Sequence, residues 1–171
     1  MTQYARPESV YSNSGWSAYG AATIPEAIDE EVASDSDYTY TTSDGTYLGV
    51  ALSEVTDPEG NTNHTLRWRY RSIRNSTPPE KGSGFLYCGA TLIATFIDNA
   101  ALPTSWTTDA YTLLTTEADA ITDYSDLRVR FTADTIGSSE EMQVSWVAFE
   151  CPDAPSEPTG GPSNLMLLGV G

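Results

Sequence analysis

The chain has 171 residues, of which 24 are Asp or Glu and only 8 are Lys or Arg, so its formal net charge at pH 7 is −16. This charge argues against binding to nucleic acid, because phosphate backbones are bound through clustered cations. The sequence also has no apolar run long enough to span a bilayer and no N-terminal secretion signal. We therefore expect one globular domain, made in a cytoplasm, with neither nucleic acid nor a membrane among its partners.

Residues 1–45 show no regular hydrophobic period and include a strongly acidic stretch, IDEEVASDSDY at 28–38. We expect an N-terminal arm that leads into an acidic edge strand or loop. Asp35, Asp37 and Asp44 could offer oxygen ligands to calcium, but their spacing lacks the order of a known calcium loop. A solvated acidic loop is therefore the favoured interpretation.

Residues 46–151 alternate apolar and polar side chains, with β-branched and aromatic residues between turns rich in Gly, Pro, Asn and Asp. This pattern predicts strands at 46–52, 64–73, 84–97, 106–114, 126–133 and 142–151. The third of these is expected to bend or form a hairpin near Gly89–Ala90.

A short helix of one to two turns is predicted within 115–127, where Thr116 and Asp119 resemble a capping box. The fold class expected from all elements together is all-β: a single antiparallel β-sandwich, jelly-roll-like, with one short helix and extended N- and C-terminal arms.

Two of the predicted strands carry five of the eight cations. Alternate side chains of a strand face opposite sides, so the apolar residues of LRWRYR and LRVRF point inward while the arginines point outward. If the two strands are neighbours, they form one basic stripe of subunit-interface candidates, namely Arg67, Arg69, Arg71, Arg128 and Arg130.

Two interpretations of this stripe stay open. The arginines could pair with carboxylates of their own chain across adjacent strands, which stabilises a sheet. They could instead meet the acidic amino-terminal third of a neighbouring copy, because guanidinium groups bind carboxylates bidentately. The second interpretation predicts a homo-oligomer, most simply a trimer.

Residues 152–171 combine a Pro, Gly and Ser linker with an apolar end, LMLLGVG. Each large apolar side chain would gain roughly 1–3 kcal/mol on full burial, so this end should dock rather than extend into water. It is expected to anchor on a neighbouring copy or an underlying shell, or else to form a last strand of its own domain. The anchor candidates are Leu165, Met166, Leu167, Leu168 and Val170.

Motifs for catalysis are absent from the sequence. His64 is the sole histidine, and no nucleophile, metal-binding or phosphate-binding spacing occurs, so we expect no enzyme activity, no cofactor and no metal. His64 is interpreted as a polar residue at a strand end. Cys88 and Cys151 are expected to be buried thiols, and a single bridge between them is left open.

Four tryptophans could include a platform for stacking sugars, because exposed aromatic rings offer an apolar face beside polar groups. They are Trp16, Trp68, Trp106 and Trp146. Three of them lie in strand patterns, which favours a place in the core.

Several segments resemble a family of β-sandwich proteins that tailed bacteriophages and prophages encode and that are assigned to the virion. They are GW at 15–16, AIDEEVASDSDYTY at 27–40, VALSEVTDPEGNTNHTLRWRYR at 50–71, LYCGATLIATF at 86–96 and LTTEADAITDYSDLRVRF at 114–131. The similarity covers about residues 5–150, and EADAITDYSDLRVRF is its most specific part.

The resemblance implies a virion structural protein without catalytic residues. A capsid decoration or cement protein is preferred, with the protein itself and a major capsid or other virion protein as partners. A tail or fibre accessory protein, or a virion-surface carbohydrate-binding module with a glycan ligand, is the alternative. The implied location is the virion, after synthesis in the host cytoplasm.

Overall fold

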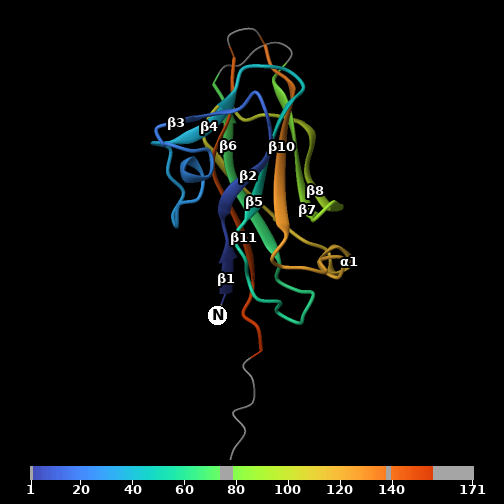
Figure 1. Cartoon of the computed structure of the whole chain (residues 1–171). Helices are drawn as coiled ribbons and strands as arrows, with labels where there is room; N and C mark the ends of the chain where they lie inside the picture. Colours follow the sequence, from blue (N-terminus) through green and yellow to red (C-terminus); the bar gives the residue numbers. More distant parts are fainter. Residues whose placement is uncertain (1, 74–78, 138–139, 156–171) are drawn as a thin grey trace, which may run out of the picture.

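The computed structural model describes residues 2–73, 79–137 and 140–155, which form two antiparallel sheets packed face to face (Figure 1). Sheet A has the order β3 (Ser17–Tyr19), β4 (Tyr38–Thr41), β11 (Met142–Pro152), β6 (Thr65–Ser72) and β9 (Thr107–Thr112), and β1 (Thr2–Ala5) also pairs with β11. Sheet B has the order β2 (Pro7–Ser14), β5 (Thr46–Leu52), β10 (Leu127–Thr135), β7 (Lys81–Cys88) and β8 (Thr91–Ala101). The predicted all-β sandwich is confirmed.

The strands from β4 onward form a nested set of pairs. The hairpin β7–β8 is innermost, and the pairs β6–β9, β5–β10 and β4–β11 follow outward. Successive levels alternate between sheet B and sheet A, which is the connectivity of a jelly roll. The hairpin turns at Gly89, where φ is +58°, a conformation that glycine adopts without steric cost.

The core lies between the inner faces of the two sheets and follows the period of two. In β6, Leu66 and Trp68 are buried, and in β10 Val129 and Phe131 are buried, while the arginines between them are partly exposed. Phe96 joins the two sheets, because its ring lies 4.6 Å from Trp68 and 5.7 Å from Phe131, measured between centroids. Burial of such a side chain contributes about 1.5–3 kcal/mol to stability.

Residues 2–41 are part of the sandwich, so the arm expected for residues 1–45 is wrong. β1 pairs with β11, β2 pairs with β5, and β3 pairs with β4. Ala5, Trp16 and Ile28 are buried in the core. The acidic residues 28–37 lie in the loop between β3 and β4, while β2 and β3 each end a sheet. These strands are short or bulged, and so their alternation is too brief to stand out in the sequence.

The described residues also include two short helical segments, the 3-10 turn η1 (Pro25–Ala27) and the helix α1 (Thr115–Ala118). The predicted helix is confirmed, but its cap is not the predicted pair. Glu117 Oε2 accepts a hydrogen bond of 2.8 Å from the backbone N–H of Leu114, because the helix begins earlier than the predicted cap at Thr116. No helix in residues 2–73, 79–137 and 140–155 has the length and apolar character to cross a membrane.

The predicted anchor at Leu165, Met166, Leu167, Leu168 and Val170 lies outside the described residues. Its docking stays a prediction.

Candidate functional site

The five arginines do not form one stripe. β6 lies between β11 and β9 in sheet A, whereas β10 lies between β5 and β7 in sheet B. Arg67, Arg69 and Arg71 therefore face outward on one side of the sandwich, and Arg128 and Arg130 on the other. The prediction of a single stripe is wrong because both strands have the same alternation of inward and outward residues, which carries no information about the sheet that a strand joins.

Three of these arginines have carboxylate partners within the chain. Arg67 pairs with Glu150 on the adjacent strand at 2.6 Å, and Arg128 pairs with Asp126 at 2.8 Å. Arg69 pairs with Asp35 at 2.6 Å. Pairing within the chain thus holds for these three, and the homo-oligomer stays a prediction.

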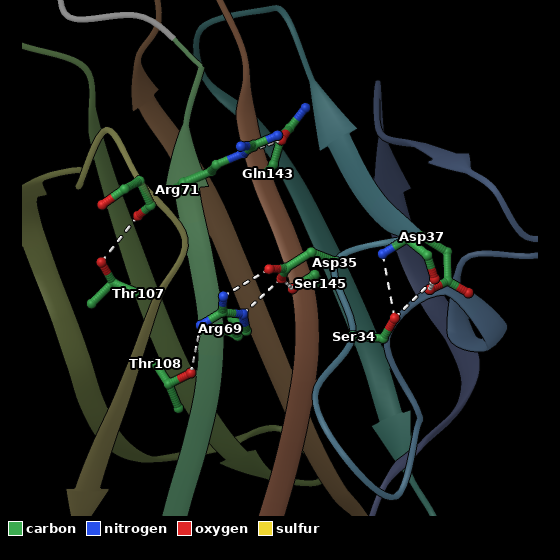
Figure 2. Close-up of polar contacts among 11 residues, drawn as sticks. Ser34, Asp35, Asp37, Arg69, Arg71, Thr107, Thr108, Gln143 and Ser145 are labelled. Carbon is green, nitrogen blue, oxygen red and sulfur yellow. Dashed lines mark hydrogen bonds and ion pairs between the residues drawn. The ribbon is translucent and has the colours of Figure 1, made fainter.

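The pair of Arg69 and Asp35 fastens the loop between β3 and β4 onto the outer face of sheet A (Figure 2). Arg69 donates from Nε and Nη2 to the two oxygens of Asp35, at 2.6 and 2.7 Å, and from Nη1 to Thr108 at 3.0 Å. Ser145 adds a hydrogen bond to Asp35 at 3.2 Å. The guanidinium group of Arg69 lowers the pKa of Asp35 below its usual value.

This geometry agrees with the favoured interpretation of the acidic loop. Asp35 is occupied by Arg69, while the carboxylate of Asp44 accepts a hydrogen bond from the backbone N–H of Ile136 near the end of β10. The three aspartates considered as an alternative calcium site therefore do not converge. Within the described part of the chain, no three His, Cys, Asp or Glu side chains are grouped so that they could hold a metal ion.

Arg71 differs from Arg69 because it stacks on a ring and has no carboxylate in ion-pair contact among the described residues. Its guanidinium carbon lies 4.3 Å from the ring centroid of Trp106. Its Nε donates to Gln143 Oε1 at 2.8 Å (Figure 2), and Gln143 Nε2 donates to Glu141 at 2.8 Å. Gln143 is fully buried, so this contact holds Arg71 in one orientation.

Tyrosines continue this surface toward the edge of sheet A. The ring of Tyr38 lies 5.8 Å from that of Trp106, and the ring of Tyr19 is stacked on Tyr38 with centroids 4.7 Å apart and planes inclined by 18°. The register of the paired strands explains these contacts. Tyr19 on β3 is opposite Tyr38 on β4, and Gln143 on β11 is opposite Arg71 on β6. We call Tyr19, Tyr38, Trp106 and Arg71 the aromatic platform.

Exposure distinguishes Trp106 from the other three tryptophans. Trp16, Trp68 and Trp146 are buried, whereas Trp106 is half-buried and Tyr19 is 56% exposed. The sequence favoured a core position for the three tryptophans in predicted strands, which is wrong for Trp106. The tyrosine neighbours of Trp106 were missed. The available signal was the alternation of YTYT at 38–41, which places two tyrosines on the outer face.

The single histidine is structural. His64 is fully buried, its Nε2 lies 2.6 Å from the hydroxyl of Tyr124, and its Nδ1 lies 3.1 Å from the carbonyl of Thr62. Burial lowers its pKa, so the ring is neutral at pH 7. Both cysteines are free and buried, as predicted, and burial raises the pKa of Cys151 to about 11.

Two open pockets, of about 330 and 280 Å³, lie away from the platform in the loops that follow β5 and α1. Asp57 and Tyr124 line both pockets. Further carboxylates line each of them, Glu59 and Asp119 the first and Asp123 the second. Neither offers an exposed aromatic face with convergent donors. The aromatic platform is therefore the stronger candidate for a ligand.

No protein-family model matches the chain, and no curated protein matches it either. The resemblance to virion proteins is therefore untested. Solved structures do match the fold. A Stig cyclase from Fischerella sp. TAU aligns at 15% identity with a TM-score of 0.53, covering 88% of this chain and 100% of that one.

Two further structures align with the chain. A second cyclase from Fischerella sp. TAU aligns at 17% identity with a TM-score of 0.50, covering 91% of this chain and 75% of that one. A family 35 carbohydrate-binding module from Clostridium thermocellum aligns at 13% identity with a TM-score of 0.46, covering 87% and 97%. At these identities the likeness is one of fold alone.

Proposed function

We propose that the protein is a non-catalytic glycan-binding domain that holds a saccharide on the aromatic platform of sheet A. The observation that carries this proposal is the line of adjacent rings from Tyr19 through Tyr38 to Trp106 on the outer face of a sheet. Beside it lies Arg71, which has no acidic partner among the described residues. Rings of this kind are usually buried, as the other three tryptophans are.

The chemistry of the platform suits a sugar. The faces of a pyranose ring carry C–H groups that pack on aromatic rings, and its hydroxyls need donors and acceptors at the rim. Arg71 supplies fixed N–H groups, because Gln143 holds its Nε and Trp106 supports its guanidinium plane. The platform lies on the face of a sheet, so it favours an extended glycan chain over a small molecule in a deep cavity.

The location of this binding follows from the resemblance and is equally a proposal. On a virion surface, such a domain would attach the particle to glycans of the host. Capsid decoration, which the sequence favoured, stays a prediction, since the residues of its anchor lie outside the described ones. The lack of catalysis also stays a prediction.

Binding can be tested on a glycan array and then by isothermal titration calorimetry of the best ligand, a readout that does not depend on Trp106. Trp106→Ala and Arg71→Ala should each weaken binding by roughly tenfold or more, as expected for Trp and Arg at the centre of a contact. Tyr4→Ala is the matched control, because Tyr4 is also an exposed ring, 47% exposed, but belongs to β1.

The proposal fails if no glycan is retained by the folded wild type. It also fails if Trp106→Ala binds the selected glycan as tightly as the control does.

A further inference from the structure

Two arginines on sheet B, Arg128 and Arg130, differ in their partners. Arg130 extends from β10 in the middle of the sheet, with its guanidinium carbon 4.2 Å from the ring centroid of Tyr47. Its Nε is buried and has no hydrogen-bond partner, and none of the described ion pairs includes it. Its neighbour Arg128, in contrast, is neutralised by Asp126.

Apolar groups surround this cation on the outer face of sheet B. Tyr11, 40% exposed, lies flat on Gly49, where an added Cβ would come within 2.4 Å of the tyrosine ring. In the register of the sheet, Arg130 is opposite Gly49 and Phe85. Leu92 is 49% exposed on β8, the strand beyond β7. An unpaired guanidinium framed by exposed apolar groups is suited to a partner with a carboxylate beside an apolar side chain.

The chain itself carries such a segment in the loop between β3 and β4. Val32 is 78% exposed, the highest value among the exposed large hydrophobic residues, and the preceding Glu31 is exposed with no side-chain contact described. The base of the loop is held in place, because the carbonyl of Glu30 accepts hydrogen bonds from Arg6 and from Trp146, the latter at 2.8 Å. Glu31 and Val32 therefore project from a part of the loop that is held in place.

We propose that the face of sheet B around Arg130 is a self-association surface, which receives Glu31 and Val32 of a second copy of this chain. The two parts cannot meet within one molecule. Asp35 fastens the loop to the outer face of sheet A, whereas Arg130 projects from the outer face of sheet B. Figure 1 shows the loop between β3 and β4 on the side opposite to β7 and β8.

The contact is of the head-to-tail kind, since one surface meets a different surface on the next copy. Such contacts close into rings when the rotation allows it, in agreement with the trimer expected from the sequence. The net charge of −16 opposes association over long distances. At physiological ionic strength this repulsion is screened beyond about 8 Å, so a local pair of Arg130 and Glu31 can decide the outcome.

Sedimentation equilibrium of the full chain at physiological salt tests the proposal. Wild type should associate reversibly. Arg130→Glu and Glu31→Arg should each weaken association by roughly tenfold or more, because each places like charges at the contact. The double variant Arg130→Glu/Glu31→Arg should associate again, since every contact then joins opposite charges. Glu54→Arg, at an exposed carboxylate elsewhere, controls for the change in net charge.

Circular dichroism should show that each variant is folded. The proposal is overturned if wild type is monomeric, if either charge reversal associates as the control does, or if the double variant fails to restore association. Binding of glycans by sheet A is measured separately and is independent of all three outcomes.

Discussion

Replacement of Tyr124 by Phe should destabilise the domain through the single histidine. The carbonyl of Thr62 can only accept, so the neutral ring of His64 carries its hydrogen on Nδ1 and accepts at Nε2 from the hydroxyl of Tyr124, 2.6 Å away. His64 is fully buried and Tyr124 is 6% exposed. Tyr124→Phe keeps the ring and removes the donor, and it leaves a buried acceptor unsatisfied.

An unsatisfied buried group of this kind costs about 1–3 kcal/mol. In a domain of this size, each kcal/mol lowers the melting temperature by roughly 2–4 °C. The melting temperature of Tyr124→Phe should therefore fall by about 2–12 °C in a thermal scan at pH 7.

Tyr111→Phe is the control for this experiment. The hydroxyl of Tyr111 donates to Glu117 at 2.9 Å in a partly exposed position, where water can replace the lost bond, so a smaller decrease is expected. A melting temperature of Tyr124→Phe equal to that of wild type would refute the assignment of His64 as a structural acceptor. A decrease as small as that of the control would refute it as well.

Two other groups give predictions of their own. Burial and the neighbouring carboxylate of Asp37 raise the pKa of Glu30 to about 7, so its folded form binds more protons than the unfolded chain, and its contribution to stability is lost as pH rises through about 7. The melting temperature of Glu30→Gln should consequently rise relative to that of wild type as pH increases from 5 to 8. A difference between the two proteins that does not change with pH would contradict the assignment. His64, whose lowered pKa acts in the opposite direction, is present in both proteins and cancels in the comparison. Cys151 is fully buried with its pKa raised to about 11, so native protein should react with a thiol reagent far more slowly than protein in denaturant, and equal rates would contradict its burial.

From residue 46 onward, the sequence by itself determined most of the elements and the direction of their side chains. The predicted strand at 46–52 is β5 with the same bounds, and the hairpin predicted near Gly89–Ala90 joins β7 to β8. The alternation in LRWRYR correctly placed Trp68 in the core and Arg69 on the surface. These features are local, because the period of two is a property of each strand and a turn depends on a few consecutive residues.

Only the tertiary structure decided which strands became neighbours. Nothing in the alternation of β6 and β10 shows that they belong to opposite sheets, and the predicted single stripe of arginines was wrong for that reason. The aromatic platform likewise depends on pairing between distant segments, since Tyr38 and Trp106 meet only because β4 and β9 both join sheet A. Strand pairing is chosen by the packing of the whole jelly roll, and a local pattern that is compatible with either sheet cannot specify it.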